Sequence, residues 1–256
     1  MCLIFISLNN HPDYKLIVAA NRDEFYPRKT EAAHFWQDYP FILGGRDLEA
    51  QGTWMGITKT GRISFLTNYR DPNNINPHAP SRGKLVSDYL QTDISPSQYL
   101  KQIEPSSKLY NGFNLIVGTA SELHYLSNYK AGIDHLTSGF FGLSNQLLDT
   151  PWPKVVRGKR LLEIELRNSH LNIERVLNLL QDESRASDDQ LPDTGIGIER
   201  ERALSSMFIK TPNYGTRCST VGAIDRNNQV EFVERVYNLS TFEFDTRRFS
   251  FQIQNQ

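Results

Sequence analysis

Residues 1–24 of the chain read MCLIFISLNNHPDYKLIVAANRDE, and this stretch decides the fold that we expect. Two apolar runs rich in β-branched residues, 2–8 and 15–20, are separated by residues 9–13, which are typical of turns. The pattern therefore predicts an antiparallel β-hairpin at the start of the chain.

The register of this hairpin brings charged residues to a cysteine. If the turn is centred between residues 11 and 12, the numbers of paired residues sum to about 23. Cys2 then lies opposite Asn21 and next to Arg22. Opposed side chains in an antiparallel pair are about 5 Å apart at Cβ, and diagonal neighbours are about 7–8 Å apart. The hairpin alone therefore delivers the segment 21–24, which reads NRDE, to the neighbourhood of Cys2.

A cysteine in these surroundings can serve as a nucleophile. The thiolate is the attacking form, and a nearby cation such as Arg22 lowers the pKa of a thiol from about 8.5. The carboxylate of Asp23 can orient the arginine or bind an α-ammonium group. Removal of Met1 would give Cys2 a free α-amino group, whose pKa of about 8 lets it accept a proton near neutral pH. Nucleophile and base would then belong to one residue.

The same residues also admit a purely structural interpretation. Free cysteine is among the most buried residue types, and charged clusters at strand ends are commonly solvated. Spacing alone therefore leaves open whether Cys2 is catalytic or packs in a core.

The rest of the chain alternates strand and helix signals. Further strands are predicted at 53–58, 62–67, 114–118, 123–126, 140–143, 220–224, 230–237 and 241–249. Helices are predicted at 95–104, which begins with an N-cap serine followed by proline, and at 153–167 and 173–180. The polar segment 181–190 is interpreted as an exposed loop, with a domain linker as the alternative. We expect two sheets with helices outside them, in a strand order that the pattern leaves open.

Composition excludes several classes of protein. The 256 residues include 28 Lys+Arg and 29 Asp+Glu, and a net charge of -1 gives no support to a nucleic-acid or anionic-membrane partner. No run of 18 apolar residues predicts a membrane span, and the opening stretch lacks the basic region of a secretory signal. Two cysteines are too few for a disulfide framework, so we expect a reducing, cytoplasmic location.

Six motifs, in order along nearly the whole chain, resemble the NRDE family, also called the transport-and-Golgi-organisation protein family. They are Cys2 after Met1, NRDE at 21–24, GGRD at 44–47 with GTWMG at 52–56, LTNYRD at 66–71, LSN at 143–145 with PWPK at 151–154, and YGTRCST at 214–220. This resemblance implies a single domain, 1–256. It further implies an α+β fold, a four-layer αββα sandwich of two antiparallel sheets similar to the N-terminal-nucleophile hydrolases. The related hydrolases are the choloylglycine hydrolase and penicillin V acylase group.

The resemblance to that hydrolase group implies roles for individual residues. Cys2 matches the N-terminal nucleophile, and Arg22 and Asp23 resemble the arginine and aspartate that support it. The hydrolases separate these two residues in sequence, whereas here they are adjacent, so the match is one of type rather than of spacing. The implied catalytic residues are Cys2, Arg22, Asp23, Asn68, Asn145 and Arg217.

Three of these residues lie far from Cys2 in the sequence. Asn68 is similar to the asparagine of the oxyanion hole, Asn145 to a second polar residue facing the nucleophile, and Arg217 to a late arginine of the site. An amide donor to the oxyanion is worth about 3 kcal/mol of barrier. The alternatives are that Asn68 and Asn145 open turns and that Arg217 is a surface strand residue.

Other prominent residues are expected to be structural. Trp54 and Trp152 are predicted to pack in the core or at its rim rather than to serve as stacking platforms. Gly44, Gly45 and Gly52 are predicted to occupy turns that need positive φ.

The remaining metal-binding and thiol-bearing types supply no further motif. Cys218 is predicted to be a buried strand residue, and the six histidines are scattered without a pattern. We assign no metal ligands and no cofactor.

These observations favour an N-terminal-cysteine amidohydrolase or acyltransferase that acts on a C–N or thioester bond of a small acyl compound. The alternative is a non-catalytic carrier of haem or a lipid-like ligand in the same cleft, because the resemblance reaches family members linked to haem traffic and lipid metabolism. Haem would need an axial ligand such as Cys2 or a histidine. A third interpretation, an interaction scaffold, has only the acidic loop 182–189 in its favour.

Overall fold

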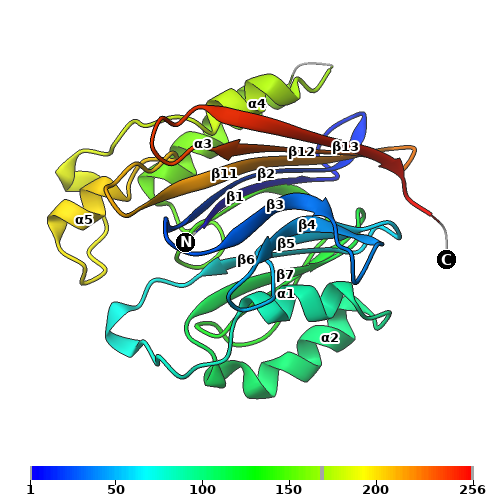
Figure 1. Cartoon of the computed structure of the whole chain (residues 1–256), viewed down its shortest axis with the longest axis horizontal. Coiled ribbons are helices and arrows are strands. Elements are labelled where there is room, and N and C mark those ends of the chain that lie inside the picture. Colours follow the sequence, from blue (N-terminus) through cyan, green and yellow to red (C-terminus); the bar gives the residue numbers. More distant parts are fainter. Residues whose placement is uncertain (1, 168–169, 255–256) are drawn as a thin grey trace.

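The computed structural model describes residues 2–167 and 170–254 and contains two antiparallel sheets with helices on their outer faces (Figure 1). The first sheet, sheet A, contains in spatial order β10 (Gly139–Leu143), β1 (Cys2–Leu8), β2 (Tyr14–Phe25), β11 (Tyr214–Asp225), β12 (Gln229–Tyr237) and β13 (Phe244–Gln252). The second, sheet B, contains β3 (Thr30–Phe35), β4 (Ile42–Asp47), β5 (Met55–Thr58), β6 (Ile63–Asn68), β7 (Phe113–Gly118), β8 (Leu123–Ser127) and β9 (Asp134–Leu136). Strands from both ends of the chain therefore share sheet A.

The helices lie outside the two sheets. They are α1 (Gly83–Leu90), α2 (Pro96–Ile103), α3 (Pro153–Leu166), α4 (Ile173–Leu179) and α5 (Ile198–Ala203). Figure 1 shows α3 and α4 over sheet A and α1 and α2 over sheet B. This is the predicted four-layer αββα sandwich. No helix among residues 2–167 and 170–254 has the length and apolar character needed to cross a bilayer.

Three apolar clusters hold the layers together, and β1 contributes to two of them. Its alternate residues Ile4 and Ile6 face sheet B, whereas Leu3 and Phe5 face α3 and α4. A third cluster joins α1 and α2 to sheet B around Tyr89. Because both faces of β1 are covered, its sequence is a continuous apolar run rather than an alternating one.

The N-terminal hairpin forms as predicted, but its register differs by one residue. Cys2 pairs with Arg22 rather than with Asn21, so paired numbers sum to 24. The loop is centred on residue 12 instead of between residues 11 and 12, and it begins with Asn9 in the left-handed conformation at φ 47°. Strand β2 also runs on to Phe25, so the NRDE segment lies within a strand, where it pairs with β11.

The predicted helices at 95–104, 153–167 and 173–180 match α2, α3 and α4 to within one or two residues, and the Ser95 capping box is present. Segment 181–190 is largely exposed and contains only a short 3-10 helix, Asp188–Gln190. Strands β3, β4 and β9 and helices α1 and α5 were not predicted.

The prediction of positive φ at Gly44, Gly45 and Gly52 is wrong. Gly44 and Gly45 lie within β4, and neither they nor Gly52 has positive φ. Their role is close approach: a Cβ at Gly45 would lie 2.3 Å from Cη2 of Trp54. The missing side chain therefore makes room for an indole ring beside the site described next.

Candidate active site

A hollow of about 520 Å³ opens at the end of the sandwich where β1 begins. Cys2, Arg22 and Asp23 line it from the paired strands β1 and β2, Asn68 from the end of β6, and Arg82 from the turn before α1. The sequence predicted the first three to lie together, and the structure brings Asn68 to the same hollow. Cys2 is only 8% exposed but is one of the lining residues.

Arg22 is held between an aromatic ring and two cysteines. Its Cζ lies 4.1 Å from the ring centroid of Trp54, a cation–π contact, and the side chain is buried. In the register of sheet A, Arg22 is the direct partner of Cys2 on one side and of Cys218 on the other. Trp54 packs against the core as predicted, but it also serves as the platform for this guanidinium group.

The protonation state of Cys2 differs from the sequence-based expectation. Burial raises the pKa of the Cys2 thiol, the charge of Asp23 raises it further, and Arg22 lowers it, with a net result above the ordinary value. The expected lowering by Arg22 is therefore present but smaller than the effect of burial. The thiol is protonated at neutral pH, so attack by Cys2 requires a group that accepts its proton.

Asp23 is fixed beneath the hollow. It is 1% exposed, and its Oδ1 accepts a hydrogen bond of 2.7 Å from Oγ1 of Thr216 on β11. Burial raises the pKa of the Asp23 carboxyl, while the nearby Lys154 lowers it. A bulge in β11 between Thr216 and Cys218 is what turns the threonine hydroxyl toward β2.

Lys154 is a site residue that sequence analysis did not assign, although it lies in the PWPK motif. It is the second residue of α3, is 3% exposed, and donates a hydrogen bond of 3.0 Å from Nζ to the carbonyl oxygen of Leu204. Burial lowers the pKa of Lys154 to about 8, with the charges of Asp23 and Cys2 opposing the shift. A lysine in the first turn of a helix is disfavoured by the helix dipole, and that was the available sequence signal.

The two predicted asparagines occupy different places. Asn68 is half-buried and lines the hollow, and its side-chain amide makes no hydrogen bond to any residue that the structure describes. Asn145 is fully buried, is not among the lining residues, and donates from Nδ2 to the carbonyl oxygen of Asn68 at 2.9 Å. Asn145 therefore positions the Asn68 backbone rather than facing the nucleophile.

Arg217 lies behind the hollow rather than in its wall. Its Nη1 donates to the carbonyl oxygens of Phe25, at 3.0 Å, and Tyr26, at 3.1 Å, and also to that of Arg28. Burial lowers the pKa of the guanidinium group, and the neighbouring charge of Arg22 adds to this shift. Arg217 thus ties down the loop that follows β2.

A second hollow of about 800 Å³ adjoins the first and is mostly apolar. The two share Glu24, Phe25, Asn68, Arg82 and Asn111. Residues found only in the second include Ile75, Ile196, Leu204, Pro212 and Tyr214.

One polar group is buried in this apolar wall. The Tyr214 hydroxyl has no hydrogen-bond partner in the part of the chain that the structure describes. Burial raises the pKa of Tyr214 well above its usual value, as does the charge of Asp23. Tyr214 is therefore a neutral donor in the wall of the second hollow.

Cys218 and Trp152 are both buried, as predicted. Cys218 is a buried residue of β11, as predicted. Trp152 packs with α3 in the cluster over sheet A, and Cζ of Arg70 lies 4.7 Å from its ring centroid. No histidine lines either hollow.

The chain is similar to known proteins in sequence and in structure. The family described as Transport and Golgi organisation 2 matches residues 1–239. The Transport and Golgi organization protein 2 homolog of Homo sapiens is 37% identical over 277 residues, covering 100% of both chains, and that of Bos taurus is 39% identical over 92% of each.

A solved structure shares the fold. The Caenorhabditis elegans ortholog of N-acylethanolamine-hydrolyzing acid amidase superposes with a TM-score of 0.50 and 12% identity, over 86% of this chain and 92% of that one. The αββα sandwich is thus a fold that this chain shares with the nematode amidase. By the extent of the sequence match, the chain belongs to the Transport and Golgi organisation 2 family.

Proposed function

We propose that the protein is an N-terminal-cysteine amidohydrolase or acyltransferase that acts on a C–N or thioester bond of a small acyl compound. One observation carries the proposal: Cys2, Arg22 and Asp23 are held together by strand pairing in the wall of a 520 Å³ hollow. Burial of an arginine and an aspartate beside a thiol costs stability, so a purely structural role does not account for it. Such groups, with perturbed pKa values in a cleft, are typical of functional sites.

The proposed reaction begins once Met1 has been removed. Sγ of Cys2 attacks the carbonyl carbon, a C–S bond forms, and the thiol proton passes to the α-amino group of Cys2. Asn68, whose amide makes no other hydrogen bond within the described chain, donates to the oxyanion. The tetrahedral intermediate then collapses, the C–N bond breaks, and the leaving amine takes the proton from the α-ammonium group.

The second half of the reaction releases the acyl group. Water attacks the thioester carbonyl, the C–S bond breaks, and the Cys2 sulfur recovers a proton, so that a carboxylic acid is released. In acyl transfer, an acceptor amine or thiol takes the place of water. Arg22 and Asp23 set the charge around the sulfur, and Lys154, with a pKa of about 8, is a further group that can exchange a proton near neutral pH.

The adjoining hollow supports a partly apolar acyl group. Its exposed lining surface is mostly apolar, although charged residues such as Arg185 and Lys210 are among those that line it. It shares Asn68 with the first hollow, and Tyr214 lies in its wall. The nematode protein of similar fold is named for hydrolysis of an N-acylethanolamine, which is an amide of this general class. Both cysteines are free thiols, and we place the reaction in a reducing compartment such as the cytoplasm.

The test is covalent labelling followed by intact-mass analysis. Protein whose N-terminus has been sequenced and shown to begin at Cys2 is incubated with a thiol-directed acyl electrophile. We expect one adduct per chain on Cys2, formed in the Cys218→Ala variant as well but not in Cys2→Ala. Cys218 is a matched control because it is the other buried thiol of the same strand row.

Two outcomes would count against the proposal. Met-free protein that remains unlabelled would show that the buried thiol cannot be reached or activated. Protein from its native host that retains Met1 would show that the α-amino group of Cys2 is never available as the base.

The second candidate function is a carrier of haem or a lipid-like ligand. The observation in its favour is the size and apolar lining of the second hollow, next to a thiol that can ligate iron. Haem titration followed at the Soret band separates the candidates. Tight binding that Cys2→Ala abolishes, without acyl turnover, favours the carrier, whereas turnover with only weak, Cys2-independent haem binding favours the enzyme.

A further inference from the structure

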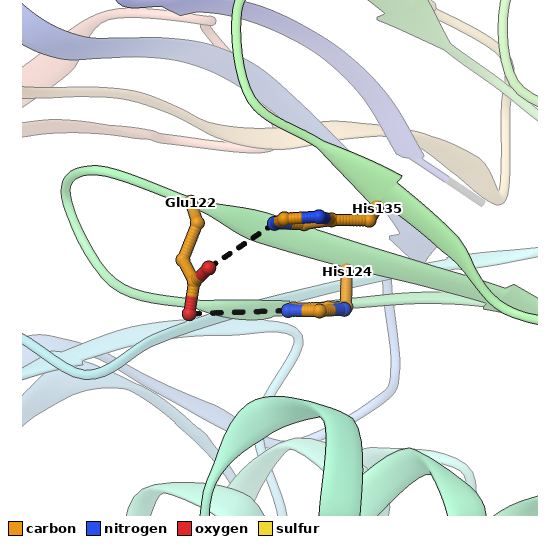
Figure 2. A group of neighbouring side chains, drawn as sticks. All are labelled: Glu122, His124 and His135. Carbon is orange, nitrogen blue, oxygen red and sulfur yellow. Dashed lines mark hydrogen bonds and ion pairs between the residues drawn. The ribbon is translucent and has the colours of Figure 1, made fainter.

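Two histidines and a glutamate meet on the β8–β9 hairpin, far from both hollows. His124 of β8 and His135 of β9 are direct partners in the strand register, and Glu122 precedes β8. Figure 2 shows the two imidazole rings parallel to each other, with the Glu122 carboxylate facing the edges of both. Sequence analysis did not identify this group, because β9 is only three residues long and was not predicted.

The ligand atoms of these three residues converge. Nε2 of His135 lies 3.1 Å from Oε2 of Glu122, and Nε2 of His124 lies 3.9 Å from Oε1. The ring centroids are 4.6 Å apart with an interplanar angle of 10°. One ligand atom from each residue lies within 4.8 Å of the others. The 3.9 Å separation exceeds hydrogen-bond distance, so the carboxylate does not occupy Nε2 of His124.

We propose that Glu122, His124 and His135 form a binding site for a divalent transition metal ion of the zinc class. Two imidazole nitrogens and one carboxylate oxygen are a donor set that suits zinc and its first-row neighbours, whereas calcium and magnesium prefer oxygen ligands alone. The side chains of Glu122 and His135 are 44% and 50% exposed, so solvent can supply the remaining ligand.

Only small movements are needed to close the site. Bond lengths of about 2.1 Å in a tetrahedral site place ligand atoms roughly 3.4 Å apart. The 3.1 Å separation between Glu122 and His135 is already close to that value. The longer separations shorten toward it if these two exposed side chains rotate toward His124, which is 12% exposed and stays in place.

The place of the site in the fold indicates a structural effect. β9 is the edge strand of sheet B, and the chain leaves it for β10, which crosses to sheet A and pairs with β1. A metal held by His124 and His135 would fasten this short edge strand to β8. Asn9, whose Nδ2 donates to the carbonyl oxygens of Ser121 and Thr137, lies at the same end of the sandwich. Cys2 is at the opposite end of β1, so the site is separate from the candidate active site.

The test is zinc binding to the full-length chain after removal of metal by a chelator. Equilibrium dialysis with elemental analysis should find one Zn²⁺ per chain more in the wild type than in His135→Asn, and no excess Mg²⁺ or Ca²⁺. Loss of one ligand should weaken the zinc affinity by at least about tenfold, since loss of even an outer partner of a metal ligand costs about 10- to 100-fold. Zn²⁺ should also raise the melting temperature of the wild type but not of His135→Asn or Glu122→Gln.

The matched control is His78→Asn, which removes an exposed histidine outside the cluster and should bind zinc as the wild type does. Both test residues are half-exposed, so their variants are expected to fold. Equal zinc binding by the wild type and His135→Asn would place the metal elsewhere and overturn the proposal. Absence of zinc binding by the wild type at micromolar concentrations would overturn it as well.

Discussion

Two consecutive parts of β2, an apolar first half at residues 16–20 and a polar second half at residues 21–23, are both buried but differ entirely in chemistry. Residues 16–20 are apolar and no more than 7% exposed, while Asn21, Arg22 and Asp23 are no more than 5% exposed. Burial of the first half stabilises the fold by about 25 cal/mol per Å² of apolar surface. Burial of the second half removes charges from water, which costs several kcal/mol per ion unless each is well paired. Asn21 is well paired, since its Nδ2 donates to the carbonyl oxygens of Leu180 and Met207, so the cost of the polar half lies in the charges of Arg22 and Asp23.

The strands next to β2 show the same change from an apolar to a polar end, because paired residues lie side by side across sheet A. Ile6 of β1 pairs with Val18, and both lie in the apolar core. Cys2 belongs to the same core cluster, but it pairs with Arg22 and also lines the hollow. One end of the sheet is thus apolar, and the other lines the hollow with polar groups. Substitutions in the two ends should separate stability from activity.

The largest expected effect comes from a pair of substitutions in β1, one at each end. Cys2→Ala should lower the rate of acyl transfer by about 10⁴-fold or more, equivalent to about 5 kcal/mol of barrier, because the nucleophile is removed. Its free energy of unfolding should change by only about 1 kcal/mol. Ile6→Ala, fully buried in the core, should instead lose about 2–5 kcal/mol of stability with little change in rate per folded molecule.

The measurements for this pair are acyl-transfer kinetics and denaturant unfolding of each variant. If Cys2→Ala kept its activity, the polar half of the hairpin would lose its catalytic interpretation. If Cys2→Ala were as destabilising as Ile6→Ala, Cys2 would instead be a core residue like the others.

The second expected effect comes from two glutamates on helix α5, one buried and one exposed. Glu201 is 3% exposed and accepts a hydrogen bond of 2.7 Å from Nη1 of Arg70, whereas Glu199 is 83% exposed and pairs with Arg202 at the surface. Glu201→Ala should lower the free energy of unfolding by about 3–5 kcal/mol, because it removes one partner of a buried ion pair. Glu199→Ala should leave stability essentially unchanged, because exposed pairs contribute little.

Chemical denaturation of the two variants in parallel checks this prediction. Equal effects would mean that water reaches the Arg70–Glu201 pair. The wall of the second hollow would then be as solvated as the surface, and the contrast between the two ends of the sandwich would be weaker than the static burial suggests.

The local part of the site could be predicted from the sequence, because strand pairing alone joins Cys2 to Arg22 and Asp23. The register was wrong by one residue, since the turn signals at residues 9–13 do not say which residue lies at the centre of the loop. The four-layer fold followed from the resemblance, and the outer helices that begin with a Ser95 cap or a Pro153 followed from their start signals.

The parts that escaped prediction depend on tertiary contacts or on weak local signals. The charges of Lys154 and Asp23 interact only because α3 packs on sheet A, and no spacing in the sequence encodes that proximity. Helix α1 starts at Gly83 without a capping side chain, and β3 has a single fully buried residue, so neither gives a strong pattern. Asn145 and Arg217 were found by resemblance, but their hydrogen bonds are to backbone groups around the site.

The smallest of the predicted effects is a pH dependence of the free energy of unfolding, which comes from Lys154 at the charged end of the sandwich. Burial lowers the pKa of Lys154 from its ordinary value of 10.5 to about 8. Because the pKa is lower in the folded chain, the unfolded chain holds the extra proton between pH 8 and pH 10.5. Stability therefore rises with pH through that window, and the full destabilisation is present at pH 8 and below. The shift corresponds to about 3 kcal/mol.

Denaturant unfolding of the wild type and of Lys154→Met, each at pH 7 and at pH 10.5, measures this slope. Tyrosines that titrate in the same window are present in both proteins, so the difference between the two proteins isolates Lys154. The wild type should gain about 3 kcal/mol relative to the variant over this interval. Parallel curves would mean that Lys154 is hydrated in solution, and Lys154 would then not be a low-pKa proton donor or acceptor next to Cys2. A measured slope would show that burial of the Lys154 charge lowers the free energy of unfolding, as expected of a residue retained for its chemistry.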